Sequence, residues 1–213
     1  MRIIKAGYEI LTPIDKKEIL KQLEIAGRIC YKSEDKITET SSSEFVRMLI
    51  KRGHEAMIEH YNLTVKFICD RGVSHEIVRH RIASYGQEST RYCNYSKDKF
   101  GNEITVIEPF FWKDGISPLN FLKFEMWKKA CKASEDTYFE LLKNGATPQE
   151  ARSILPNSLK TEIVMTANLR EWRHFFKLRT SHAAHPQMKE ITVPLLAELK
   201  DLLPEIFEDI EVK

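Results

Sequence analysis

The chain of 213 residues contains few of the residues that break or cross-link a fold, with 8 Gly, 8 Pro and 4 Cys. Cys30, Cys69, Cys93 and Cys131 are scattered and include no C-x-x-C pair, so neither a zinc site nor a disulfide framework is predicted. We expect reduced and mostly buried thiols. Because no repeat, low-complexity tract or Pro/Gly/Ser-rich linker divides the sequence, we predict a single domain over residues 1–213.

Long apolar runs and a strong excess of one charge are also missing. The first twenty residues contain no apolar signal region, and no run is long enough to cross a bilayer, so we expect a cytoplasmic protein without membrane contact. The 33 basic and 31 acidic residues give a net charge of +2, so any attraction for phosphate must come from local clusters. G-x-G-x-x-G, G-x-x-x-x-G-K-[ST] and G-x-S-x-G are absent; a nucleotide would therefore be held mainly by side chains.

Hydrophobic periodicity predicts strands and helices without a regular βαβ order, which indicates an α+β fold. The expected buried stripes are Ile19, Leu23, Ala26 and Ile29 or Cys30 in one helix, and Leu122, Met126, Trp127, Cys131, Tyr138 and Leu141 in the longest. Strands are predicted at 2–11, 61–70, 102–109 and 158–168, and helices at 12–31, 41–53, 117–145, 147–155, 170–180 and 185–207, the last bent near Pro194, with a short helix opening at Ser74.

Positive charge is concentrated between Val78 and Tyr92, which begins with Arg79-His80-Arg81. If residues 74–83 are helical, the two arginines point roughly 200° apart and hold separate parts of a ligand, or ligands in adjacent subunits. Guanidinium groups bind phosphate through two parallel hydrogen bonds. The alternative is a solvated helix with ion pairs to Glu76 and Glu88.

Two other segments combine histidines with charge. In residues 53–60, His54 and His60 are six residues apart and H-E-x-x-H is absent, so we favour polar surface or a cofactor-contacting histidine over a metal site. A second basic cluster, interleaved with aromatic residues, follows further along the chain. This pattern suits nucleotide recognition, although an amphipathic helix with an aromatic core face also fits. The cluster contains Arg170, Arg173, Lys177, Arg179, His174, His182 and His185, with Trp172, Phe175 and Phe176 between them.

The segment from Arg79 to Ser89 resembles the R-H-R-x7-S motif of flavin-dependent thymidylate synthases. The resemblance continues in Arg91-Tyr92, in residues 53–60, and in "ARSILP" and "NLREWRHFFKLR". Two positions depart from the family pattern. Many members have Asn-Glu where this chain has Gly86-Gln87, and Ser is common where it has Ala56.

The resemblance implies a homotetramer with a mixed, mainly antiparallel sheet flanked by helices and with active sites shared between subunits. It implies reductive methylation of dUMP to dTMP, with 5,10-methylenetetrahydrofolate as carbon donor, FAD as hydride carrier and NADPH as reductant. Two alternatives are a flavin- or nucleotide-binding protein without this catalysis and a nucleic-acid-binding module.

The resemblance also assigns site residues. Arg179 would lie at the uracil ring and stabilise charge on its N3–C2–O2 edge. Ser89 would orient dUMP rather than act as an obligatory nucleophile, because an unactivated hydroxyl is a poor one. No metal and no nucleic-acid partner are expected. The implied cofactor contacts are His54, Ala56, Arg79, His80, Arg81, Gln87, Asn168, Leu169, Arg170 and His174, and the implied dUMP contacts are Glu76, Arg79, Gln87, Glu88, Ser89, Thr90, Arg91, Arg152 and Arg179.

Overall fold

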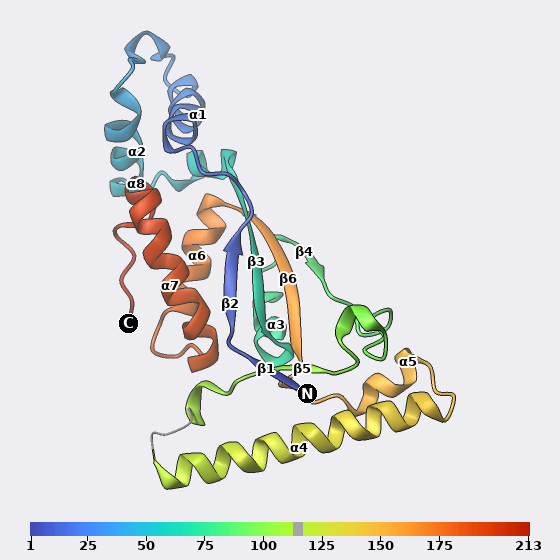
Figure 1. The fold of residues 1–213 in the computed structure, drawn as a ribbon. Coiled ribbons are helices and arrows are strands. Elements are labelled where there is room, and N and C mark those ends of the chain that lie inside the picture. The colour runs from blue at the N-terminus through green and yellow to red at the C-terminus, as the bar shows by residue number, and fades with distance from the viewer. Residues whose placement is uncertain (113–116) are drawn as a thin grey trace. The chain divides into compact units, whose positions relative to one another are not determined.

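The computed structural model describes residues 1–112 and 117–213 of the chain. Figure 1 shows the fold as a ribbon. By their contacts, the described residues divide into two compact units. The first unit contains Met1–Gly7, Phe67–Arg79 and Gly86–Ile163, and the second contains Tyr8–Lys66, His80–Tyr85 and Val164–Lys213. None of the helices in the described ranges is both long enough and apolar enough to cross a membrane.

A four-stranded, mainly antiparallel sheet carries residues of both units, and its strand order is β2-β3-β6-β4. In the two long strands of this sheet every second side chain is buried, because successive side chains of a strand point to opposite faces. Leu63, Val65, Phe67 and Cys69 of β3 are buried as predicted. The strands are β2 (Gly7–Ile10), β3 (Asn62–Asp70), β4 (Ser84–Gln87) and β6 (Lys160–Asn168).

The first unit contains a parallel pair of short strands and the longest helix, α4. Ser117 begins α4 by accepting a hydrogen bond from the Asn120 backbone N–H, and Gly145 follows its end with φ +91°, as predicted. Thr147 and Glu150 form a capping box at the next helix. The elements are β1 (Arg2–Ile4), α3 (Arg71–Ile77), η3 (Asp98–Phe100), β5 (Thr105–Ile107), η4 (Phe110–Trp112), α4 (Pro118–Lys143), α5 (Pro148–Ala151) and η5 (Arg152–Ile154).

The second unit is mostly helical. Asp15 caps its first helix as predicted, and Trp172, Phe175 and Phe176 of α6 are fully buried, so these rings form core and the stacking interpretation of them is wrong. The helices are α1 (Lys16–Ile29), η1 (Glu34–Lys36), α2 (Ser41–Lys51), η2 (Glu55–His60), α6 (Leu169–Arg179), α7 (Pro186–Leu202) and α8 (Pro204–Phe207).

Three predicted elements differ from the structure. Residues 2–11 form two strands in two sheets instead of one strand. The final helix is interrupted at Leu203, which precedes a proline and is therefore disfavoured in the helical region, while Pro194 is accommodated inside α7. The helix expected from Ser74 begins at Arg71, because the Asp70 carboxylate accepts a hydrogen bond from the Val73 N–H at 2.7 Å.

Helix α3 ends at Ile77, so Arg79 and Arg81 are not helical. The prediction that a helix turns their side chains in opposite directions is therefore wrong. The chain instead enters β4, a strand that the sequence did not predict. Gly86 lies in this strand. The burial of β4 alternates along its four residues, but Tyr85 is the strand's one large apolar side chain, so the sequence alone shows no hydrophobic alternation there.

The predicted buried stripes are partly wrong. In α4, Met126 is 64% exposed and Leu122 is also exposed, whereas Phe124 and Glu135 are buried. In α1, Ile29 is 51% exposed, and the buried face turns instead toward Leu20, Glu24 and Gly27. The carboxylates Glu24 and Glu135 form part of the buried faces of α1 and α4, and a pattern of apolar residues alone does not predict their burial. Of the four free thiols, Cys69 and Cys131 are buried and Cys30 is exposed.

Candidate functional site

The centre of the R-H-R motif forms a chain of hydrogen bonds with α6 inside the second unit. Arg179 Nε donates to His80 Nε2 at 3.0 Å, and His80 Nδ1 lies 3.1 Å from Glu171 Oε1. Because a guanidinium Nε–H only donates, His80 Nε2 must carry a lone pair. The imidazole is therefore the Nδ1–H tautomer, and it donates that proton to Glu171.

Burial keeps His80 neutral. Desolvation lowers the pKa of His80 below its usual value of 6.5, and the nearby Arg179 charge lowers it further, against the raising effect of the Glu171 hydrogen bond. The ring of Phe175 packs edge-on against the imidazole at 4.8 Å between centroids. The neutral state is the one that accepts from Arg179, so burial and hydrogen bonding favour the same arrangement.

His80, Glu171 and His174 also bring three possible metal-ligand atoms within 4.8 Å of one another. Both ring nitrogens of His80 are already engaged, one with Arg179 and one with Glu171. A metal would have to displace the Arg179 hydrogen bond or the Glu171 hydrogen bond. The cluster therefore fits an orienting role for His80 better than ligation.

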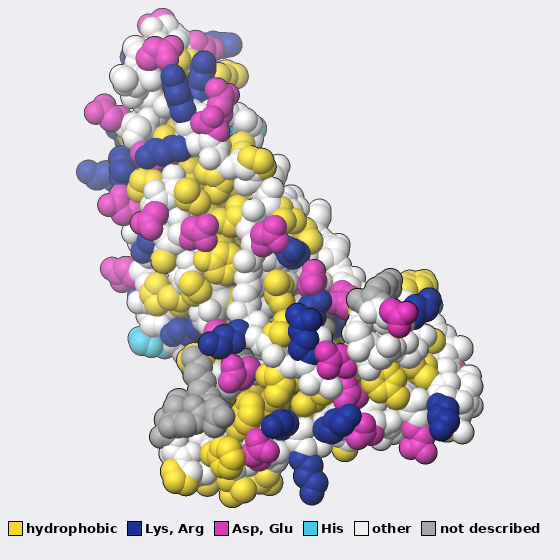
Figure 2. Space-filling view, viewed as in Figure 1, with side chains coloured by type: hydrophobic (Ala, Val, Ile, Leu, Met, Phe, Trp, Pro, Cys, Tyr) yellow, Lys and Arg dark blue, Asp and Glu magenta, His cyan; other side chains and the backbone are white. Residues whose placement is uncertain are grey.

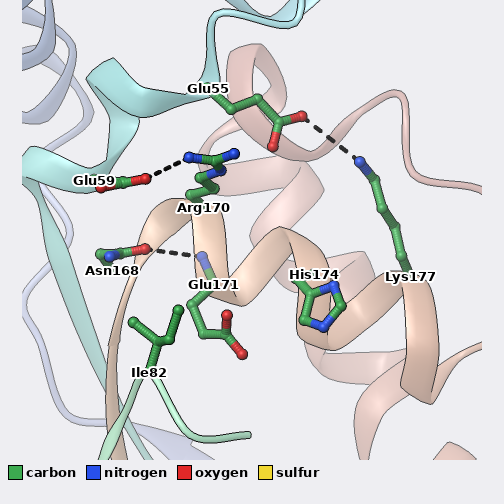
Figure 3. Close-up of a pocket in the computed structure, with 8 residues that line it drawn as sticks. All are labelled: Glu55, Glu59, Ile82, Asn168, Arg170, Glu171, His174 and Lys177. Atoms are coloured by element: carbon green, nitrogen blue, oxygen red, sulfur yellow. Dashed lines mark hydrogen bonds and ion pairs between the residues drawn. The ribbon is translucent and has the colours of Figure 1, made fainter.

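A pocket of 540 Å³ lies along α6 in the second unit, and we call it the α6 pocket (Figure 3). Asn168 begins α6, since its Oδ1 accepts from the Glu171 backbone N–H at 2.8 Å. Arg170 and Lys177 face the η2 carboxylates across the pocket. Its lining residues are Glu55, Glu59, Ile82, Asn168, Arg170, Glu171, His174 and Lys177.

The second basic cluster is largely neutralised by carboxylates. Arg170 Nη1 lies 2.6 Å from Glu59, and Lys177 Nζ lies 3.6 Å from Glu55. Arg173 is 1% exposed and pairs with Glu55 and Asp209, and it also donates to a backbone carbonyl. The Asp209 hydrogen bond and the two carboxylate charges raise the pKa of Arg173 above its ordinary value, against the effect of burial. Arg173 is thus a core ion-pair residue instead of a phosphate contact.

A second pocket, of 570 Å³, lies where α1, α2 and η2 meet, and we call it the hairpin pocket. His54 and Ala56 line it, whereas Glu55 and Glu59 of the same segment line the α6 pocket. The η2 segment therefore presents predicted cofactor residues to one pocket and carboxylates to the other. Tyr31 and Phe45 add aromatic surface, and Lys36 and Arg52 add positive charge.

Within the first unit, the predicted dUMP residues near the end of the motif occupy defined positions. Gln87 Nε2 donates to Ser74 Oγ at 2.8 Å and to Thr161 Oγ1 at 3.2 Å, which fixes its side chain. The Glu88 carboxylate accepts from Lys160 at 3.1 Å, so Lys160 neutralises it. In the alternative interpretation Glu88 pairs with the R-H-R arginines, but within the described part of the first unit no ion pair joins Glu88 to Arg79.

The next residues form a tight turn. Ser89 Oγ accepts from the Arg91 backbone N–H at 3.3 Å, and no histidine or carboxylate contacts that hydroxyl among the residues that the structure describes. Arg91 Nε donates to Gln149 at 3.1 Å. Thr90 is buried, and its Oγ1 lies 3.5 Å from Arg152 Nη1. Thr90 and Arg152 line a third pocket, of 610 Å³, together with Arg71, His75, Gln149 and Ser153; we call it the Arg71 pocket.

The remaining predicted residues are placed individually. Arg79 and Arg81 are exposed, and the Arg79 N–H donates to the Glu76 carbonyl at 3.3 Å. Glu76 is half-buried on α3. Leu169 is fully buried, and its N–H donates to the Tyr61 carbonyl at 3.0 Å, so it contributes packing at the start of α6.

Sequence reasoning missed the acidic members of these sites. Glu171 stands one residue after the predicted Arg170 and was not considered. Glu55, between the predicted His54 and Ala56, was considered only as a metal ligand and not as a partner of the α6 cations. The segment "REWRH" places Glu171 three residues before His174, a helical spacing that puts both on one face and was available as a signal. Arg71 carried no such signal, because "CDRG" reads as an ordinary end of a strand.

Comparison with known proteins identifies the family of the chain. Residues 14–205 match the family described as thymidylate synthase complementing protein. A flavin-dependent thymidylate synthase of Geobacter sulfurreducens is 31% identical over 192 residues, covering 87% of this chain and 79% of that protein. Enzymes of the same name from Pyrococcus abyssi (38% identity, 78% and 66% coverage) and Corynebacterium glutamicum (30%, 98% and 85%) are also similar. The chain therefore belongs to the thymidylate synthase complementing protein family.

Proposed function

We propose that the protein is a flavin-dependent thymidylate synthase that methylates dUMP to dTMP. The family match and the names of the relatives support this activity. The structural observation that carries the proposal is the hydrogen bond from Arg179 to the buried, neutral His80. That bond fixes the plane of a guanidinium group before any substrate arrives, which is what electrostatic catalysis requires.

The α6 pocket and the hairpin pocket have the size and chemistry for a flavin cofactor. Their volumes of 540 and 570 Å³ lie in the range of cofactor sites. Asn168 and His174 would hydrogen-bond ring heteroatoms, and Arg170 would bind phosphate after exchanging its partner Glu59. His54, which directly precedes η2, would contact the cofactor from the hairpin pocket. When bound and reduced by NADPH, the flavin would supply the hydride that converts the transferred one-carbon unit to a methyl group.

Arg179 would act on the uracil ring. Attack by C5 on the one-carbon donor requires electron density at C5. Loss of the N3 proton to solvent would raise that density, and the resulting negative charge is delocalised over the N3–C2–O2 edge until C5 attacks. A positively charged group held at this edge stabilises that charge. Because His80 accepts from Nε, the guanidinium is oriented without help from the ligand, and Glu171 keeps His80 in the accepting tautomer.

Ser89 would bind and orient dUMP. A serine nucleophile needs an adjacent base, and the hydroxyl of Ser89 instead accepts from the backbone N–H of Arg91 among the described residues. We therefore propose a reaction without an obligatory protein nucleophile. The predicted dUMP contacts Gln87, Thr90 and Arg152 belong to the same unit, and the two Nε2 hydrogen bonds of Gln87 leave its Oε1 as an acceptor.

We further propose the details of the reaction and of the protein that the resemblance implies. For the reaction, 5,10-methylenetetrahydrofolate is the carbon donor and NADPH the reductant. For the protein, residues 1–213 form one catalytic domain, the location is cytoplasmic, and the assembly is a homotetramer with shared active sites. Exposed apolar residues support self-association: Leu119, Phe121, Leu122 and Met126 are each at least half exposed on one end of α4. Such a cluster is typical of surfaces that a partner covers.

A nucleic-acid-binding function receives less support. Figure 2 shows basic and acidic side chains interspersed over the face that it presents. Arg170, Arg173 and Lys177 are paired with carboxylates, which would have to be displaced before a phosphate backbone could bind.

Flavin absorbance of the purified protein after incubation with FAD tests the proposal. Bound FAD gives a visible spectrum that survives gel filtration. Asn168→Ala, which would remove a proposed cofactor contact, weakens it more than the control change Asn120→Ala at a half-buried position of α4. A colourless protein that binds DNA with a steep salt dependence would contradict the proposal and favour the nucleic-acid-binding module.

A further inference from the structure

The Arg71 pocket in the first unit is lined by cations without carboxylates. Arg71, Arg152 and His75 contribute basic groups to its 610 Å³, and Thr90 and Ser153 contribute hydroxyls. Among the described residues that line it, none is Asp or Glu. In this respect it differs from the α6 pocket, where three glutamates offset the basic side chains.

Arg71 has an unusual hydrogen-bonding state. Its Nη1 is buried and has no hydrogen-bond partner within the described part of the chain. Its backbone is fixed, because the Arg71 N–H donates to the Asn157 carbonyl at 3.1 Å and the preceding Asp70 caps α3. The guanidinium therefore lies at the wall of the pocket with a donor that none of the described residues satisfies.

A buried charged donor without an acceptor destabilises a fold, and native proteins rarely keep one. An anion in the pocket removes this cost. Phosphate suits the lining, because its terminal oxygens accept the parallel N–H bonds of guanidinium groups and the hydrogen bonds of hydroxyls. Arg152, which is exposed and lies beside Thr90, can turn toward the same anion.

We propose that Arg71 is a phosphate-binding residue and that, with Arg152, it holds the phosphate monoester of the nucleotide substrate. The inference rests on the proposed function, in which that substrate is dUMP. Two guanidinium groups and an imidazole around one pocket match a dianion with three terminal oxygens. The diphosphate of the flavin offers the same chemistry from a second source, so the experiment must separate the two.

The test compares wild-type protein with Arg71→Gln, Arg71→Lys and the control Arg2→Gln, an exposed arginine on β1 of the same unit. Titration calorimetry measures the dissociation constants of dUMP, of deoxyuridine, which lacks the phosphate, and of FAD. Loss of a charge-assisted hydrogen bond predicts dUMP binding about 10- to 100-fold weaker in Arg71→Gln. Arg71→Lys keeps the charge but cannot donate two parallel hydrogen bonds, so its loss of dUMP affinity is intermediate. The dissociation constants of deoxyuridine and FAD, and all three constants of the Arg2→Gln control, remain at wild-type values.

A melting temperature without ligand separates binding from folding. Because Arg71 is an unsatisfied buried donor, Arg71→Gln leaves the melting temperature unchanged or raises it, and the stabilisation by dUMP shrinks. A lowered melting temperature with equal losses for dUMP and deoxyuridine would make Arg71 a structural residue. Weakened FAD with unchanged dUMP would assign the pocket to the cofactor and overturn the proposal.

The outcomes also separate this inference from the proposed function. If wild-type protein forms dTMP and Arg71→Gln binds dUMP normally, only the inference fails. If wild-type protein binds dUMP through Arg71 but forms no dTMP, only the proposed function fails. If wild-type protein does not bind dUMP, both the inference and the proposed function are refuted.

Discussion

Replacing His80 with phenylalanine tests whether Arg179 depends on the imidazole for its orientation. Phenylalanine keeps an aromatic ring against Phe175, which lies 4.8 Å from the imidazole between ring centroids, but it removes the acceptor at Nε2 and the donor at Nδ1. The substitution therefore releases the Arg179 guanidinium without removing its charge. It also leaves the Glu171 carboxylate without its imidazole donor.

The size of the effect follows from the lost hydrogen bond. The Arg179–His80 contact of 3.0 Å has a charged donor, and such bonds contribute about 1.5–3 kcal/mol. If that energy holds Arg179 in its productive orientation, His80→Phe lowers kcat/KM by roughly 10- to 150-fold. Arg179→Gln, which removes the electrostatic group itself, lowers kcat by about 10²- to 10³-fold.

A double-mutant cycle measures how far the catalytic effect of Arg179 depends on His80. Steady-state dTMP formation is measured for the wild type, for each single variant and for the double variant, with Phe175→Leu as a control for altered packing. We expect His80→Phe to cost little in the Arg179→Gln background, so that the coupling energy is about 1.5–3 kcal/mol. Additive losses would refute the orienting role, since they would mean that His80 and Arg179 act independently.

Three further predictions concern pH, the core and Ser89. Because the pKa of His80 is lowered in the folded protein, the unfolded chain takes up a proton below about pH 6.5 that the folded imidazole does not. The free energy of unfolding, measured in urea, should therefore fall as the pH falls from about 6.5 to the folded pKa. The same dependence of this free energy on pH in His80→Phe would contradict the prediction. Arg173→Met removes a buried guanidinium that pairs with the half-exposed Asp209, and it should lower the free energy of unfolding by about 1.5–3 kcal/mol. The exposed Arg170→Met should change it by less than about 1 kcal/mol, and equal effects in urea unfolding would argue against the core role of Arg173. Ser89→Ala should weaken dUMP binding and leave measurable dTMP formation; complete loss of product with dUMP binding intact would favour covalent catalysis instead.

Local patterns in the sequence predicted much of the fold. The alternation in β3 placed Leu63, Val65 and Phe67 in the core, and the caps at Asp15 and Ser117 located the starts of α1 and α4. These signals act over a few residues, so they survive in a single sequence. The division of residues 2–11 between two sheets depends instead on partners far along the chain, which local periodicity does not encode.

The candidate site shows the same limit. The spacing from Arg79 to Ser89 identified the family, but charge density suggested a basic surface on α6. In the structure, Arg170 and Arg173 are paired with carboxylates of η2, more than a hundred residues earlier. The role of Glu171 as a partner of His80 is likewise a tertiary contact, although its spacing from His174 gave a weak helical signal.

The most direct test of the proposed function is dTMP formation by the purified protein loaded with FAD. With dUMP, 5,10-methylenetetrahydrofolate and NADPH present, we expect dTMP to accumulate, to require all three compounds, and to disappear when FAD is removed and return when it is restored. Product formation that is unaffected by removal of FAD, or a flavin-loaded protein that oxidises NADPH without ever forming dTMP, would contradict the proposed function.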